Sequence, residues 1–322
     1  MTINILLFTA GLLMLYYGAE WLVRGSSSLA GSLGMQPIVI GLTVVAFGTS
    51  APELVVSLVS SIKGKSMIAV GNIIGSNICN IALVLGMTAL FQPIKCHPSV
   101  VKRDIPIMLG ITLYFLVVSG NSTISRIEGA SLVGAIVLYI YYNYRVASRR
   151  TSDETVAVQR DGSEILPVKH RSRQIALIAA GIAGVVIGAE ILINSAVKIM
   201  VVFGVSEKFI GLTIVAFGTS LPELATSVIA AMKKEMDISL GNLVGSNVFN
   251  ILAVLGAAAL VNPIVIPGGF MGSGLFIDYM VMMTVSAMPF FMIRKSFTLS
   301  RMDGAILLTT YGGYIAYLVL KG

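Results

Sequence analysis

Long runs of apolar residues dominate the chain, and short polar stretches separate them. A helix needs about 17 to 25 predominantly apolar residues to cross the hydrocarbon core of a membrane. Runs of about this length recur from the third residue almost to the last. The pattern predicts ten transmembrane helices, near residues 3–23, 37–62, 66–91, 105–120, 126–146, 174–196, 207–232, 237–262, 273–293 and 302–320.

The composition agrees with a membrane protein. Of the 322 residues, 56% are apolar and 11% are charged, and the mean hydropathy is +0.91, whereas a soluble domain carries about 25% charged residues. This deficit excludes a soluble enzyme, a disordered chain and a nucleic-acid binder, and it makes membrane lipid the expected surroundings. Cys79 and Cys96 provide neither a disulfide framework nor metal-ligand spacing. The first run contains Glu20 and Trp21 where a signal peptide would have its cleavage site, so we interpret it as a retained helix.

The distribution of basic residues predicts the orientation in the cell membrane. Ten helices place both termini on the same side. If that side is extracellular, 16 of the 22 Lys and Arg residues fall in cytoplasmic connections, as the positive-inside rule requires. We therefore expect a multi-pass protein with extracellular termini and a cytoplasmic, charged central loop at 147–173.

An internal repeat divides the chain. The segment GLTVVAFGTSAPELVVS from Gly41 recurs as GLTIVAFGTSLPELATS from Gly211, and GNIIGSNICNI from Gly71 recurs as GNLVGSNVFNI from Gly241, always 170 residues later. We assign residues 1–146 and 174–322 to two five-helix halves, with repeat motifs at 41–94 and 211–264 and a linker at 147–173. Because five is odd, the second half enters the membrane in the opposite direction. The predicted fold is an all-α integral membrane protein of ten helices in two inverted repeats, whose binding site is expected at the junction of the halves.

Two acids stand out because they lie at matching positions near the middle of predicted helices. Glu53 and Glu223 each cost at least about 2.5 to 3.5 kcal/mol at the membrane centre unless they are partnered or hydrated. The structural alternatives are a protonated, hydrogen-bonded glutamate or a Glu–Lys pair, but neither helix core contains a basic residue. Pro52 and Pro222, which precede the acids, cannot donate to the carbonyls four residues earlier. The motif therefore combines carboxylates, released carbonyls and the hydroxyls of Thr49, Ser50, Thr219 and Ser220.

The second motif of each half adds further oxygens. At helical spacing, Ser76 and Asn80 share one face with Asn72, and Ser246 and Asn250 share the equivalent face with Asn242. Asn77 and Asn247 point about 100° away and are expected to support neighbouring structure. The GxxxG pairs that begin at Gly71 and Gly241 predict close helix contacts.

These donors are hard oxygens, without a histidine or thiolate pattern. Such a set favours Ca²⁺, Mg²⁺ or Na⁺ over zinc or copper, and a flexible cage suits Ca²⁺ better than Mg²⁺. Two carboxylates neutralise one Ca²⁺ or about two Na⁺, whereas an empty, doubly negative site is costly to move through a low-dielectric barrier. The chemistry therefore predicts ion exchange, with Ca²⁺ and Na⁺ as transported ions and no cofactor.

At these residues the sequence resembles the sodium/calcium exchanger family, within the cation/calcium antiporters, and in particular its compact prokaryotic members. The two GTSxPE motifs and the two GSN segments carry the resemblance. It implies that Glu53 and Glu223 ligate Ca²⁺ and Na⁺, and that helices one and six slide across the rest of the protein. It also implies ligands from the backbone or side chains of Thr49, Ser50, Thr219, Ser220, Ala46, Ala216, Ser76, Ser246, Asn80 and Asn250.

Some relatives, including potassium-dependent exchangers, have Asp where this chain has Asn250, so K⁺ co-transport is not expected. The short linker also lacks the large calcium-sensing domains of eukaryotic relatives. We expect a functional monomer.

The same residues allow other functions. H⁺/Ca²⁺ antiport is the main alternative because a buried glutamate can carry protons, and a passive channel is a further one. An intramembrane enzyme would need a nucleophile–base pair or a histidine metal site, but His97 and His170 lie in predicted connections. Glu20 and Glu190 are expected near helix ends, where interfacial pairing is ordinary, and Asp278 near the start of the ninth helix.

Overall fold

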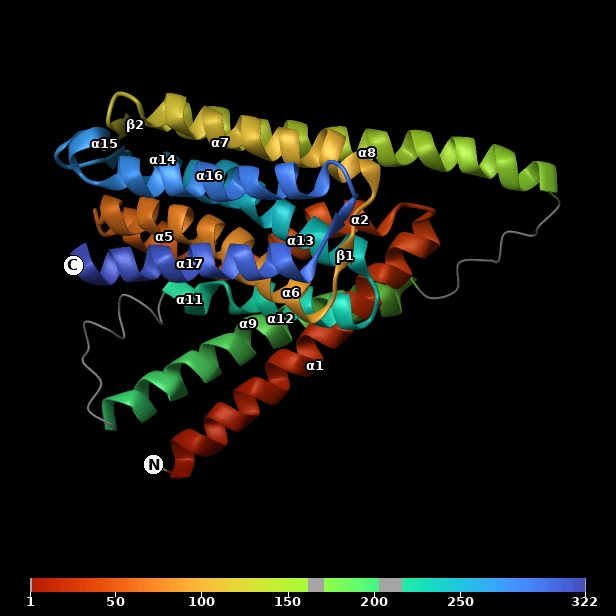
Figure 1. Cartoon of the computed structure of the whole chain (residues 1–322), viewed down its shortest axis with the longest axis horizontal. Coiled ribbons are helices and arrows are strands. Elements are labelled where there is room, and N and C mark those ends of the chain that lie inside the picture. The colour runs from red at the N-terminus through yellow and green to blue at the C-terminus, as the bar shows by residue number, and fades with distance from the viewer. Residues whose placement is uncertain (1, 162–170, 203–215, 322) are drawn as a thin grey trace.

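The computed structural model describes residues 2–161, 171–202 and 216–321, and it is almost entirely helical (Figure 1). Within these residues, six helices are long and apolar enough to cross a membrane, and a bent pair of helices makes a seventh. The six are α1 (Thr2–Leu33), Ser66–Phe91, α9 (Arg171–Val202), Met236–Val261, α16 (Leu275–Ile293) and Arg301–Leu320 within α17 (Arg301–Lys321). The bent pair, Pro37–Thr49 and Ala51–Ile62, turns by 46°.

The three remaining predicted spans also coincide with helices. They are α7 (Ile105–Ser119), which follows the π-helix η3 (Val100–Asp104), α8 (Arg126–Asp161), and α12 (Leu221–Met232) with the short α11 (Ala216–Thr219) before it. The first part of the seventh span, 207–215, lies outside the described residues. Each of the ten predicted spans therefore overlaps a helix in the part of the chain that the structure describes.

Some helices run further than their apolar runs predict. The first ends at Leu33 instead of residue 23, because hydroxyls in its polar end bond to neighbouring elements. Ser27 donates to Glu235 Oε1 at 2.6 Å, and Ser32 donates to Gln174 Oε1 at 2.9 Å. The fifth continues to Asp161, inside the predicted linker, over a stretch that contains neither Gly nor Pro to end it.

The long helices of the repeat motifs are interrupted at equivalent places. The second span is built from α2 (Pro37–Ile40), the π-helix η1 (Gly41–Val45), α3 (Ala46–Thr49) and α4 (Ala51–Ile62). The third is built from α5 (Ser66–Ile78), η2 (Cys79–Leu85) and α6 (Gly86–Phe91), and the eighth from α13 (Met236–Phe249), η5 (Asn250–Leu255) and α14 (Gly256–Val261). Single π-turns inside α-helices are rare and concentrate at functional sites. Those of the third and eighth spans begin beside Asn80 in one half and at Asn250 in the other.

Two short antiparallel ladders join the halves. β1 (Ile94–Lys95) pairs with β4 (Thr298–Leu299), with Ile94 opposite Leu299, and β2 (Thr123–Ile124) pairs with β3 (Ile264–Val265), with Ile124 opposite Ile264. A short helix, α15 (Gly269–Gly272), follows β3. β1 and β3 are repeat equivalents, 170 residues apart, yet β1 lies toward one end of the molecule and the β2–β3 ladder toward the other (Figure 1). This placement is the one expected for inverted halves.

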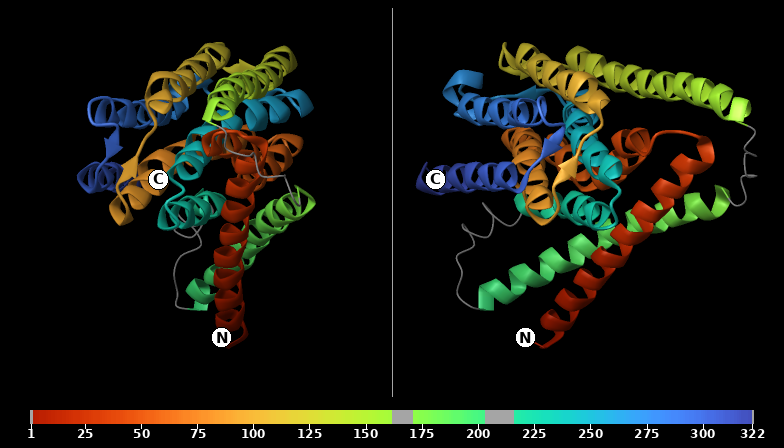
Figure 2. Two further views of the ribbon diagram at one scale, coloured as in Figure 1. Left: turned by 90° about the vertical axis from the view of Figure 1, so that its right-hand side faces the viewer. Right: turned by 45° about the vertical axis from the view of Figure 1, so that its right-hand side comes forward.

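α1 and α9 lie against each other and project from the remaining helices (Figure 2). Glycines make this contact possible. A Cβ added at Gly18 would lie 2.6 Å from the Val185 backbone nitrogen, and one added at Gly181 would lie 2.5 Å from the Leu22 nitrogen. Small residues allow two membrane helices to approach backbone to backbone in this way.

The central helices pack through glycine too. A Cβ at Gly241 would meet the Ile38 carbonyl oxygen at 2.7 Å, and one at Gly245 would meet Ala46 Cβ at 2.7 Å. The predicted close contact of this GxxxG pair is therefore confirmed. For the pair that begins at Gly71 the predicted close contact is not found among the described residues, because a Cβ added at Gly71 or at Gly75 would meet no atom within 4 Å.

Both motif helices end in the same kind of turn. After α4, the Lys65 N–H donates to the Ser60 carbonyl at 2.8 Å, and Gly64 has a φ of 67°. After α12, the Glu235 N–H donates to the Ala230 carbonyl at 2.8 Å, and here Lys234 has a φ of 63°. This left-handed helix ending favours glycine, so the second half has a lysine in a backbone conformation that the first half gives to glycine.

Candidate ion-binding site

Glu53 and Glu223 are fully buried, and each lies in the first turn of a helix that follows a break. The breaks fall at Ser50 and Ser220, whose ψ angles of 9° and 6° depart from helical values. The proline before each glutamate fits this first turn because its missing N–H has no partner to lose there. The positive end of the helix dipole favours a carboxylate at the same place. Local sequence therefore puts both acids at helix N-termini inside the protein.

Hydroxyls from both halves surround the two carboxylates. Ser50 Oγ donates to Glu223 Oε1 at 3.2 Å, and Ser76 Oγ donates to Glu53 Oε1 at 3.4 Å. Thr219 also interacts with Glu53, and the charges of the two glutamates interact with each other. Each acid is thus in contact with the GTS motif of the opposite half. The structure brings together the residues that the sequence placed 170 positions apart.

Thr49 joins this group through the eighth span. Its hydroxyl donates to Asn242 Oδ1 at 3.0 Å and lies 3.4 Å from Ser246 Oγ. On the other side, Asn72 Nδ2 donates to the Glu53 carbonyl oxygen at 3.2 Å. Asn72 thus ties α5 to the helix that carries Glu53. Asn242 also donates to Ser227 Oγ at 3.1 Å and so links Thr49 to the helix that carries Glu223.

The backbone carbonyls predicted as ligands differ between the halves. The Ala46 carbonyl accepts the Ser50 N–H at 3.0 Å and the Thr49 hydroxyl at 3.4 Å. An ion at this oxygen would have to replace the longer bond. In the second half, Ser220 N–H donates to the Phe217 carbonyl at 3.2 Å instead, and Ala216 is the first residue of α11.

Five buried oxygens at the centre have no hydrogen-bond partner among the described residues. They are Glu53 Oε2, Glu223 Oε2, Asn80 Oδ1, Asn250 Oδ1 and Ser220 Oγ. A buried acceptor without a partner costs about 1 to 3 kcal/mol, so five of them near one crossing of helices need a common explanation. Carboxylate, amide and hydroxyl oxygens are the ligands that Ca²⁺ and Na⁺ accept.

The donor set contains no soft ligands. Over residues 2–161, 171–202 and 216–321, no three His, Cys, Asp or Glu side chains gather in a metal-binding group. The two cysteines are free and buried. Burial raises the pKa of Cys96, which lies in a connection, to about 12, so this thiol is neutral at physiological pH.

The remaining acids lie elsewhere. Glu20 forms an ion pair with Lys233 at 2.8 Å, which confirms the expected pairing, while Glu190 is exposed. The expectation that both lie near helix ends is wrong, because α1 and α9 continue well beyond them. Asp278 lies in the first turn of α16, as predicted, and accepts the Tyr314 hydroxyl at 3.2 Å.

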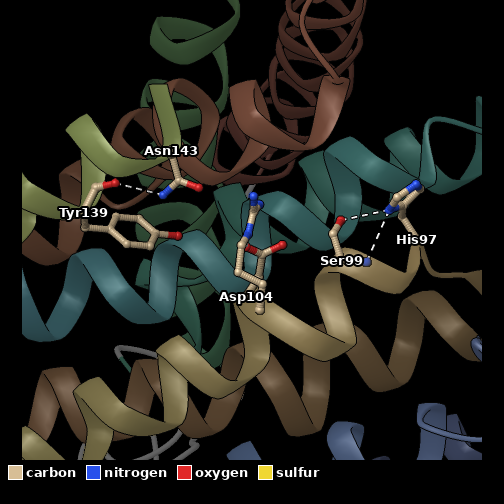
Figure 3. A network of polar contacts seen from close by, with 6 residues as sticks. His97, Ser99, Asp104, Tyr139 and Asn143 are labelled. Carbon is tan, nitrogen blue, oxygen red and sulfur yellow. Dashed lines mark hydrogen bonds and ion pairs between the residues drawn. The ribbon is translucent and has the colours of Figure 1, made fainter. Parts of the chain in front are cut away.

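A third buried acid, Asp104, does not stand out in the sequence. Arg103 Nε donates to Asp104 Oδ1 at 2.7 Å, so the adjacent residue offsets the charge. In the view of Figure 3, Asp104 lies between Tyr139 and Asn143 of α8 on one side and Ser99 and His97 on the other. His97 is exposed and lies 2.8 Å from the Ser99 hydroxyl, consistent with its predicted place in a solvated connection. This group is separate from the central oxygens.

Comparisons with known proteins agree with the fold. Residues 3–145 and 173–320 match the family model described as sodium/calcium exchanger protein. The chain is 38% identical over 306 residues to the putative antiporter CaxA of Alkalimonas amylolytica, covering 94% of this chain and 95% of that protein. It is 31% identical over 351 residues to the sodium/calcium exchanger MaX1 of Methanosarcina acetivorans, covering 99% and 98%.

A solved structure also matches. The sodium-calcium exchanger NCX_Mj, soaked with zero Na⁺ and Ca²⁺, superposes with a TM-score of 0.83 at 32% identity, covering 98% of this chain and 99% of that one. This likeness confirms the predicted fold of ten helices in two inverted repeats. The chain is a multi-pass membrane protein and belongs to the sodium/calcium exchanger family.

Proposed function

We propose that this protein exchanges Na⁺ for Ca²⁺ across the cell membrane by alternating access, with Glu53 and Glu223 as the central ligands. The observation that carries the proposal is the pair of fully buried carboxylates, each with one oxygen that no described residue bonds. Family membership and the likeness to NCX_Mj and MaX1, both named sodium/calcium exchangers, support it.

Charge explains why such a site would exchange ions instead of conducting them. Two carboxylates balance one Ca²⁺ or two Na⁺, so either load makes the site electrically neutral. Without an ion, two negative charges would be buried together in a medium of low dielectric constant. The conformational change is therefore easier for the loaded protein, so the site returns across the membrane only after the other ion has bound.

The remaining ligands are proposed by position. Asn80, Asn250 and Ser220 have side-chain oxygens free to bind an ion. The other proposed ligand groups are Thr49, Ser50, Thr219, Ser76 and Ser246, with the carbonyls of Ala46 and Ala216. Asn250 is neutral, so the site has two acids and we propose that transport does not require K⁺. One chain supplies every one of these groups, so the monomer is the proposed functional unit.

The proposed orientation has extracellular termini and a cytoplasmic linker, as the excess of basic residues in the corresponding connections favours. The ladders support the grouping of the connections. β1 and β4 both belong to connections assigned to the cytoplasm, β2 and β3 both belong to connections assigned outside, and the strands pair within each group.

Purified protein in liposomes tests the function. Vesicles loaded with Na⁺ and diluted into Na⁺-free, K⁺-free buffer should accumulate radiolabelled Ca²⁺, and vesicles without a Na⁺ gradient should not. Uptake driven equally well by a pH gradient without Na⁺ would make H⁺ the coupling ion. Flux without any counter-ion would indicate a channel.

Charge-neutral variants test the site. Glu53→Gln and Glu223→Gln keep the side-chain shape and should abolish Ca²⁺ uptake while the protein elutes as a single folded species. Glu190→Gln is the matched control, because it also neutralises a glutamate within a membrane helix but at an exposed position. Wild-type uptake by either central variant would contradict the carboxylate site.

A further inference from the structure

Four asparagines join the two halves where α5 and α13 meet. Asn77 Nδ2 donates to the backbone carbonyl of Asn247, and Asn247 Nδ2 donates to the backbone carbonyl of Asn77, both at 3.4 Å. Asn80 Nδ2 donates to Asn247 Oδ1 at 3.2 Å, and Asn250 Nδ2 donates to Asn77 Oδ1 at 3.0 Å. All four side chains are at most 1% exposed. We call this group the asparagine clasp.

The clasp fixes which way each amide faces. If Asn77 were turned over, its oxygen would face the Asn247 carbonyl oxygen and its NH₂ group would face the NH₂ group of Asn250. Both contacts would place like partial charges together, because a carbonyl only accepts and an NH₂ group only donates. The same holds for Asn247 with respect to Asn77 and Asn80. The backbones of α5 and α13 therefore set the orientation of the inner pair of amides.

The inner pair, Asn77 and Asn247, in turn sets the orientation of the outer pair, Asn80 and Asn250. Asn80 and Asn250 each donate a hydrogen bond from Nδ2 within the clasp. Their Oδ1 atoms have no hydrogen-bond partner among the described residues. Asn80 lies one helical turn beyond Ser76, which bonds Glu53, so both are on the face directed at the acids. The π-helices at these positions, η2 from Cys79 and η5 from Asn250, begin within one residue of each other in the two halves.

We propose that Asn77 and Asn247 are positioning residues, which turn the amide oxygens of Asn250 and Asn80 toward the transported ion. The proposal rests on the proposed function, since it takes those two oxygens as ion ligands. The assignment is crossed between the halves: Asn77 acts through Asn250, and Asn247 acts through Asn80. Without the inner partner, the outer amide is free to turn its NH₂ group toward the cation, which repels it.

A double-mutant cycle tests the crossed assignment, because residues that act through one another give non-additive effects. The measurement is Ca²⁺ binding to the purified full-length protein by calorimetry. Asn77→Ala and Asn250→Ala should each weaken Ca²⁺ binding on the order of tenfold, as expected for one misdirected polar contact. The double variant should bind no more weakly than Asn250→Ala alone. Combining Asn77→Ala with Asn80→Ala should instead give the product of the two effects, on the order of a hundredfold.

Ser61→Ala is the matched control. The Ser61 hydroxyl also joins the halves from a buried position, through the Ala258 carbonyl at 2.7 Å, but it does not contact the central oxygens. Ca²⁺ binding by this variant should stay within about twofold of wild type, because the lost bond lies away from the ion. Transport by Asn77→Ala should show a raised KM for Ca²⁺ with kcat little changed, a split that general loosening of the fold would not produce.

The outcomes separate this proposal from the proposed function. Normal Ca²⁺ binding by Asn77→Ala overturns the positioning role even if transport is Na⁺-driven. The role is also overturned if the effect of Asn77→Ala adds fully to that of Asn250→Ala, as it is expected to do with Asn80→Ala. Absence of Ca²⁺ binding by the wild-type protein overturns the proposed function itself, and this inference with it. If Asn77→Ala is not recovered folded, the equivalent cycle of Asn247→Ala with Asn80→Ala decides in the same way.

Discussion

The close contact between α1 and α9 makes a quantitative prediction for Gly18→Ala. The added methyl carbon would lie 2.6 Å from the Val185 nitrogen and 2.7 Å from the Gly184 carbonyl carbon. Carbon atoms in favourable contact are about 3.5 to 4.0 Å apart, so the helices must separate by roughly 1 Å. All the obstructing atoms belong to backbone, which cannot rotate away. Overpacking of this kind costs about 1 to 3 kcal/mol.

Gly31→Ala on the same helix provides the control. A Cβ there would meet no atom within 4 Å, and alanine is favoured over glycine in a helix by about 1 kcal/mol. The difference in the free energy of unfolding between the two variants does not contain this gain in helix propensity, because both variants share it. The free energy of unfolding in detergent should therefore be about 1 to 3 kcal/mol lower for Gly18→Ala than for Gly31→Ala. Equal stability of the two variants would refute the backbone-to-backbone contact.

Two further predictions concern the turn after α12. Lys234→Gly should raise the free energy of unfolding by about 0.5 to 1 kcal/mol, because glycine adopts the positive φ without strain. Gly64→Lys at the equivalent turn should lower the free energy of unfolding. A loss of stability in Lys234→Gly would show that the lysine side chain contributes more than the strain costs. Glu20→Gln should lower stability by less than about 1 kcal/mol, since the pair with Lys233 is partly exposed at 29% and 36%, and the difference should shrink in high salt; a loss that persists in high salt would contradict an exposed pair.

Much of the fold follows from one-dimensional patterns. Apolar runs predict the helices, and the 170-residue shift predicts the repeat and its inversion. The sequence did not predict that α1 continues to Leu33, because hydroxyls such as Ser27 bond to residues far along the chain. The burial of Asp104 is also not evident from the sequence, because the adjacent Arg103 makes the pair look like part of a charged connection.

Some residues of the candidate site can likewise be identified from the sequence, and others cannot. Glu53 and Glu223 stand out because an unpaired acid in an apolar run is costly, whatever surrounds it. The roles of Asn77 and Asn247 depend on how α5 and α13 cross, so helical spacing could only turn them away from the polar row. In the proposed site, which amide atom would face the ion is a property of the two helices together and cannot be read from either one.

The two ladders limit how this protein can alternate between its two sides. Each takes one strand from each half, and they lie at opposite ends of the molecule. Transporters built from repeats can rock one repeat against the other around a central site, but here such rocking would break backbone hydrogen bonds at both ends at once. α1 and α9 form no part of either ladder, and their glycines hold them in backbone contact. Under the proposed alternating access, the moving part would thus be assembled from one helix of each half, and the same pair of helices would gate both faces of the membrane.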